Sequence, residues 1–150
     1  MIVADPNLLV DLLVTGDRTD AAEAARKRDP HWIAPSLWRS EFRNALSLYH
    51  RRQMLSLERA IAVAAVAEKL MYQREFPVKS ASVLDLSARS GCSAYDCEFV
   101  ALAQTWGVEL VTSDEMILDR FPSTAVSLEA FTACGQRKNP ARRPLGSRQS

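Results

Sequence analysis

The chain alternates short, continuous runs of apolar residues with longer segments in which apolar residues recur every three or four positions. The short runs predict buried strands, and the longer spacing predicts helices that bury one face. The expected strands are residues 2–4, 32–34, 108–112 and 125–128. The expected helices are residues 6–15, 19–28, 36–52, 56–72, 82–89, 94–105 and 115–120. Strands alternating with helices are typical of an α/β fold with a mainly parallel sheet covered on both faces.

The predicted architecture is a three-layer α/β/α domain around a short, mainly parallel sheet of four or five strands. The helices of residues 36–89 interrupt the alternation, so helix outweighs strand. In open sheets of this kind, ligands bind beyond the carboxyl ends of the strands. Residues that directly follow a strand are therefore the first candidates for a functional site.

Length and composition narrow the class of protein. The 150 residues, 47% of them hydrophobic and 25% charged, suit one globular domain and exclude a mainly disordered chain. The longest apolar run, Ala60 to Ala67, is too short to cross a bilayer, and the first residues lack the basic segment of a signal peptide. The three cysteines have no CxxC spacing, which indicates reduced thiols in the cytoplasm rather than a zinc site.

Charge is distributed unevenly along the chain. Five of the 19 lysines and arginines follow Gly135 and none of the 18 acids does, so residues 1–134 carry four more acids than bases. We therefore expect a domain over residues 1–134 and a basic, flexible tail over residues 135–150. An acidic domain does not bind nucleic acid by bulk charge. If it handles nucleic acid, a bound divalent cation is the simplest way to overcome the repulsion.

Four carboxylates occupy positions that suit such a cation. Asp5 follows the first predicted strand, and Asp114 follows the strand of residues 108–112. Asp96 shares a helix face with apolar residues, and Glu41 lies beside the apolar stripe of its helix. Converging carboxylates repel one another, and Mg²⁺ or Mn²⁺ favours such oxygen ligands. A cation bound there can activate water and neutralise charge on a phosphodiester.

Each of these acids also has a purely structural interpretation. Asp5 before a proline and Asp114 before a short helix are both good helix N-caps. Asp96 in a first turn gains from the helix dipole, and a helical glutamate such as Glu41 is usually solvated. Caps alone do not readily explain all four, since two of them follow strands.

The sequence resembles the PIN-domain ribonucleases, in particular the VapC-type toxins of bacterial toxin–antitoxin pairs. The matching segments, in the family's order and approximate spacing over about residues 1–131, are VADPNLLVDLL, SEFRNAL and SAYDCEFVALAQTWGVELVTSDEMILDRFP. The resemblance implies a PIN-like fold in which Asp5, Glu41, Asp96 and Asp114 surround Mg²⁺ or Mn²⁺. It also implies cleavage of single-stranded or loop RNA to 5′-phosphate and 3′-hydroxyl products, a homodimer, and inhibition by a cognate antitoxin.

Further residues belong to the predicted surroundings of the site. Family members often carry a hydroxyl residue just after the first aspartate, where this chain has Pro6 and Asn7. Either Asn7 supplies that polar contact or nothing does. Ser113 either orients Asp114 or is a turn residue. The other expected neighbours, bound to substrate or supporting the acids, are Asn44, Arg39 and Arg43, although a basic stripe is more often solvated surface.

The preferred interpretation is a metal-dependent endoribonuclease that forms the toxin of a toxin–antitoxin module. A catalytically inactive PIN-like scaffold that binds RNA or protein is the main alternative. A receiver-like phosphoacceptor domain fits poorly, because Asp5 is unpaired and the only lysine after Lys79 is Lys138 in the tail. If exposed, the Phe42/Tyr49 surface or the Ala60–Ala67 surface can serve as the antitoxin groove or the dimer seam.

Overall fold

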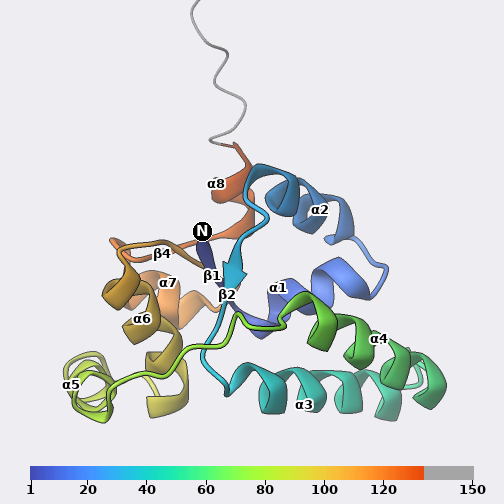
Figure 1. The fold of residues 1–150 in the computed structure, drawn as a ribbon, viewed down its shortest axis with the longest axis horizontal. Coiled ribbons are helices and arrows are strands. Elements are labelled where there is room, and N and C mark those ends of the chain that lie inside the picture. The colour runs from blue at the N-terminus through green and yellow to red at the C-terminus, as the bar shows by residue number, and fades with distance from the viewer. Residues whose placement is uncertain (134–150) are drawn as a thin grey trace, which may run out of the picture.

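The computed structural model describes residues 1–133, which form one four-stranded sheet surrounded by helices (Figure 1). The strands are β1 (Ile2–Ala4), β2 (Trp32–Ile33), β3 (Leu110–Val111) and β4 (Ala125–Val126). The helices are α1 (Pro6–Leu13), α2 (Thr19–Arg28), α3 (Trp38–Arg51), α4 (Leu57–Leu70), α5 (Ser80–Ser90), α6 (Ala94–Trp106), α7 (Glu115–Arg120) and α8 (Leu128–Ala133). The basic tail expected over residues 135–150 lies outside the described residues.

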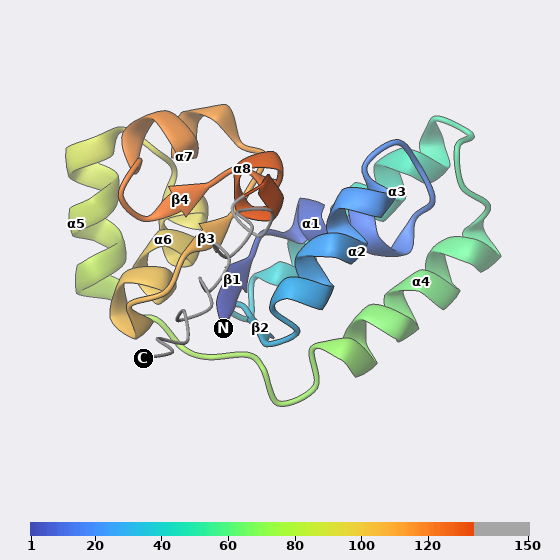
Figure 2. The same ribbon diagram turned by 90° about the horizontal axis from the view of Figure 1, so that it is seen from above.

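The sheet is entirely parallel, with strand order β2-β1-β3-β4, which confirms the predicted α/β class. Strands β2 and β3 flank β1 on opposite sides. Right-handed connections therefore place the helices that lead to β2 and the helices that lead to β3 on opposite faces of the sheet. Figures 1 and 2 show α5, α6 and α7 on one side of the sheet and α1 and α2 on the other. The three layers expected from the sequence are therefore present. Because the strands are parallel, their carboxyl ends all lie at the same edge of the sheet.

The core lies between the sheet and these helices. The strands are buried almost throughout, and α6 buries Cys97, Phe99 and Val100 against β1 and β3. Helices α3 and α4 pack against each other and against α1, so the long helical stretch predicted at residues 36–89 begins as a hairpin. None of the helices in residues 1–133 has the length and apolarity needed to cross a membrane.

The end of the described chain differs from the sequence expectation. Residues 125–128 were expected to form a strand, but β4 ends at Val126 and Leu128 begins α8. The Ser127 hydroxyl accepts a hydrogen bond from the Ala130 N–H at 3.1 Å and so caps this helix. Leu128 and Phe131 are buried, and α8 packs on α2. Leu128 is therefore the first residue of a short amphipathic helix and not the last of a strand. Four residues are too few to show the helical spacing of apolar positions.

Candidate metal centre at the carboxyl edge of the sheet

Asp5 stands where the central strand β1 ends and α1 begins. The residue as a whole is only 7% exposed. One carboxylate oxygen, Oδ1, accepts a hydrogen bond from the Asn7 N–H at 2.8 Å, and Oδ2 accepts one from the Thr112 hydroxyl at 2.8 Å. Asp5 is therefore the N-cap of α1, as its structural interpretation required, and at the same time a buried acid at the edge of the sheet.

Asp114 follows the neighbouring strand β3 and caps α7, because its Oδ1 accepts a hydrogen bond from the Ile117 N–H at 3.0 Å. Its own N–H donates to the Thr112 hydroxyl oxygen at 3.0 Å. Thr112 is 2% exposed. Through these two hydrogen bonds its hydroxyl group links Asp5 to the start of the Asp114 turn. Ser113 is exposed, and its side chain makes none of the hydrogen bonds found in residues 1–133. The hydrogen bond to Asp114 that was considered for Ser113 is made by Thr112 instead.

The other two acids come from helices whose first turns approach this edge. Asp96 lies in the first turn of α6, where the Ser93 hydroxyl caps the helix by accepting from the Asp96 N–H at 3.1 Å. Glu41 lies in the first turn of α3. Both side chains are partly buried.

The four carboxylates repel one another. Burial is the largest cause that raises the pKa of Glu41 to about 7, and the charges of Asp5, Asp96, Glu98 and Asp114 raise it further. Burial also raises the pKa of Asp5. Hydrogen bonds from the Asn7 N–H and the Thr112 hydroxyl lower it, and the charges of Asp114 and Asp96 raise it. All four predicted acids therefore share one electrostatic environment, and Glu98 joins them as a fifth acid.

No basic side chain balances this charge within residues 1–133: none of the four acids forms an ion pair there. Nor does any trio of His, Cys, Asp or Glu in that range stand close enough to form a ready metal cage. The donor set nevertheless fits Mg²⁺ or Mn²⁺, which accept carboxylate oxygens and keep several waters between themselves and the protein. Asp5, Glu41, Asp96 and Asp114 are the residues that would hold the ion, directly or through water.

The arginines expected beside the site pair instead with acids of α4 and of the segment that follows it. Arg39 donates to Glu75 at 2.5 Å and lies 3.5 Å from Glu68, and Arg43 lies 3.6 Å from the same Glu68 carboxylate. Both arginines are therefore engaged in ion pairs away from the four acids. Asn7 and Asn44, by contrast, line a groove together with Glu41.

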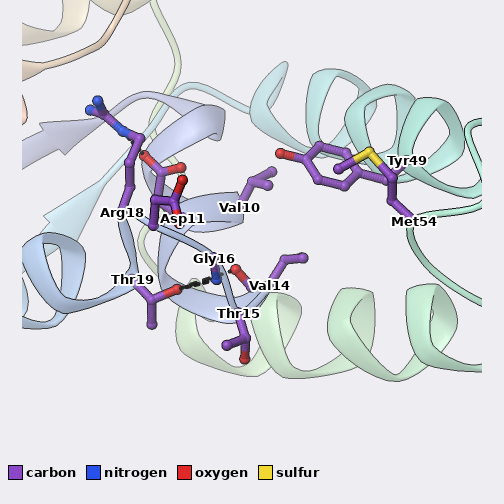
Figure 3. A pocket seen from close by; sticks show the side chains of 10 residues that line it. Val10, Asp11, Val14, Thr15, Gly16, Arg18, Thr19, Tyr49 and Met54 are labelled. Carbon is purple, nitrogen blue, oxygen red and sulfur yellow. Dashed lines mark hydrogen bonds and ion pairs between the residues drawn. The ribbon is translucent and has the colours of Figure 1, made fainter.

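A separate hollow of about 320 Å³ lies at the opposite end of α1 (Figure 3). Val10, Val14, Tyr49 and Met54 form its apolar part. The Asp11 carboxylate in its wall accepts a hydrogen bond from Arg18 at 3.0 Å. Asp11 therefore has a basic partner, unlike the four acids at the carboxyl edge.

The raised pKa of Glu41 predicts a pH-dependent stability in the presence of EDTA. In the folded chain Glu41 keeps a proton up to about pH 7, whereas an unfolded glutamate loses it near pH 4.3. The folded state thus binds more protons than the unfolded state between these values, so this group makes stability fall as pH rises through them. We expect Glu41→Gln to raise the melting temperature more at pH 8 than at pH 5.5.

Glu23→Gln, an exposed acid on α2, is the matched control, and its effect on melting temperature should not grow with pH in the same way. An equal shift for Glu41→Gln at both pH values would contradict the assigned environment.

Comparison with known proteins agrees with this geometry. Residues 2–122 match the family model of the PIN domain. The chain is 32% identical over 128 residues to ribonuclease VapC3 of Mycobacterium tuberculosis strain H37Rv, an alignment that covers 81% of this chain and 88% of that relative.

Two crystal structures share the fold. PAE2754 from Pyrobaculum aerophilum superposes with a TM-score of 0.66 at 19% identity, covering 89% of this chain and 94% of that one. FitAcB from Neisseria gonorrhoeae superposes with a TM-score of 0.61 at 15% identity, covering 86% and 99%. The family match spans most of the chain, and it includes all four acids at the carboxyl edge. The chain therefore belongs to the PIN-domain family and is related to the VapC ribonucleases.

Proposed function

We propose that this protein is a metal-dependent endoribonuclease that hydrolyses RNA phosphodiester bonds with Asp5, Glu41, Asp96 and Asp114 as its catalytic acids. The observation that carries the proposal is the group of four mutually repelling carboxylates without a basic partner in residues 1–133. Its position at the carboxyl edge of a parallel sheet suits a ligand site. The relationship to ribonuclease VapC3 supports RNA as the substrate.

The chain's own residues divide the work in this proposal. Asp5 and Asp114 are fixed by helix caps and by Thr112, so they present oxygens from a rigid edge. Burial and the neighbouring acids raise the pKa of Glu41 to about 7, so this side chain can take up or release a proton near neutral pH. A bound Mg²⁺ or Mn²⁺ supplies charge neutralisation and activation of the attacking water.

The same proposal includes a cognate antitoxin and a homodimer, as the resemblance to VapC-type toxins implies. Phe42 is buried in the core and provides no surface for either partner. Ile61 and Val66 on α4 are 62% and 50% exposed, and they leave an apolar face for a protein partner. A cytoplasmic location is supported by Cys92 and Cys97, which are buried free thiols.

The test is cleavage of RNA by the purified protein with Mn²⁺ or Mg²⁺, repeated with EDTA. We expect cleavage that depends on the metal, products with 5′-phosphate ends, and Mn²⁺ binding measurable by calorimetry. Cleavage that survives EDTA would remove the metal mechanism. A protein that neither binds Mn²⁺ nor cuts RNA would instead be an inactive PIN-like scaffold.

A further inference from the structure

A groove of about 480 Å³ opens beside Glu41, between α1, α3 and α6. Glu41 forms part of its wall, so the groove and the acids share one side chain. Asn7, two residues after Asp5, and Tyr95, immediately before Asp96, also line it. The groove is therefore continuous with the proposed metal centre.

The lining has an apolar part and an amide part. The apolar surface is provided by Leu37, Ala45, Leu48 and the ring of Tyr95, a residue that is 64% exposed. Such an exposed aromatic ring beside aliphatic side chains is a platform for a flat, apolar face.

The polar part of the groove carries amides and a hydroxyl. Asn44, Asn7 and Ser40 can donate and accept hydrogen bonds, and none of the described residues in the lining is lysine or arginine. Phosphate binding by charge is therefore disfavoured in the groove, whereas a group with a flat face and a hydrogen-bonding edge is favoured.

We propose that this groove binds one nucleobase of single-stranded RNA, next to the phosphate that the acids handle. Unstacked bases are recognised by stacking on aromatic rings and by hydrogen bonds to their edges. Tyr95 stacks on the base, and Asn44 reads its edge. The proposal rests on the proposed ribonuclease function and adds to it the element that selects the cleavage sequence.

The experiment measures binding of short single-stranded oligoribonucleotides in EDTA, where no metal-dependent cleavage occurs. The ligands are homopolymers of A, C, G or U and an abasic phosphodiester chain of equal length, followed by fluorescence anisotropy. We expect at least one homopolymer to bind more tightly than the abasic chain. Tyr95→Ala should reduce that difference by about 5- to 150-fold, the range that loss of one base–aromatic stack gives.

Matched variants distinguish loss of the base–aromatic stack from a general loss of structure. Tyr95→Phe keeps the ring and should bind like the wild type. Tyr72→Ala removes an equally exposed tyrosine, 70% exposed beyond the end of α4, and should change nothing. Asn44→Ala should narrow the differences among the four bases while the preference over the abasic chain remains.

Three results would overturn the base site. One is a wild type that binds the abasic chain as tightly as every homopolymer. Another is a Tyr95→Ala variant that loses affinity for the abasic chain equally. The third is a change of molecular mass by sedimentation in Tyr95→Ala, which would make this surface a contact between protein chains.

Cleavage assays with Mn²⁺ distinguish this proposal from the function on which it rests. Base-dependent binding that needs Tyr95, in a protein that cuts no RNA, would reject the ribonuclease and leave a base-binding groove. Cleavage that shows no base preference, and is unaffected by Tyr95→Ala, would leave the ribonuclease and reject the base site.

Discussion

Replacing Asp5 by asparagine is expected to lower RNA cleavage by about 10²–10³-fold or more without weakening the fold. Losses of this size follow removal of one group that stabilises charge in a transition state. Asparagine still caps α1, because its amide oxygen can accept the Asn7 N–H. The buried negative charge, however, is gone, and with it a ligand for the cation.

Stability and metal binding provide independent measurements on the same variant. Since burial raises the pKa of Asp5, its ionised form opposes folding above that pKa, and the neutral asparagine should melt at an equal or higher temperature at pH 7.5. Added Mn²⁺ should raise the melting temperature of the wild type and not that of the variant. Asp17→Asn, at an exposed acid in the α1–α2 loop, should leave both properties intact. Cleavage by Asp5→Asn within tenfold of the wild type would exclude Asp5 from the catalytic centre.

Thr112→Val is expected to weaken Mn²⁺ binding and cleavage by about 10- to 100-fold, the usual cost of removing a group that orients a metal ligand. Valine has nearly the same shape but loses the bond to Asp5 and leaves the Asp114 N–H without its acceptor. The unpaired polar groups should also reduce the free energy of unfolding by about 1–3 kcal/mol. Calorimetric Mn²⁺ titration and urea denaturation measure the two effects.

Thr112→Ser separates positioning from packing. Serine keeps the hydroxyl and loses only a buried methyl group, so it should cost about 1 kcal/mol of stability and retain Mn²⁺ affinity close to that of the wild type. Retained Mn²⁺ affinity in Thr112→Val, together with a loss in Thr112→Ser, would show that Thr112 acts through packing alone.

Local signals in the sequence predicted most of the fold. Asp5-Pro6 and Ser93 mark helix starts, Gly91 and Gly107 mark helix ends, and all four strands were expected near their observed positions. Helix α8 was missed because its burial depends on contact with α2, more than a hundred residues earlier in the chain. The apolar pattern of a short segment does not show which distant helix it packs against.

The candidate site, too, was predictable where local signals define it and not where distant segments meet. The carboxyl-edge rule and the family resemblance identified four acids that the structure places in one electrostatic environment. Thr112 was overlooked because it reads as the last residue of a buried strand, and only the pairing of β1 with β3 brings its hydroxyl to Asp5. The groove at Tyr95 could not be predicted either, since α3 and α6 form it jointly.

The pairing of β1 with β3 also determines when during synthesis the acids can assemble. Translation produces Asp5 long before the Thr112 hydroxyl that holds it, which stands 107 positions later in the chain. A nascent chain that stops before Leu110 lacks β3, one of the two strands beside β1, together with Thr112 and Asp114. A complete set of four acids is therefore present only after residue 114 has been synthesised, and products that terminate earlier carry an unassembled site.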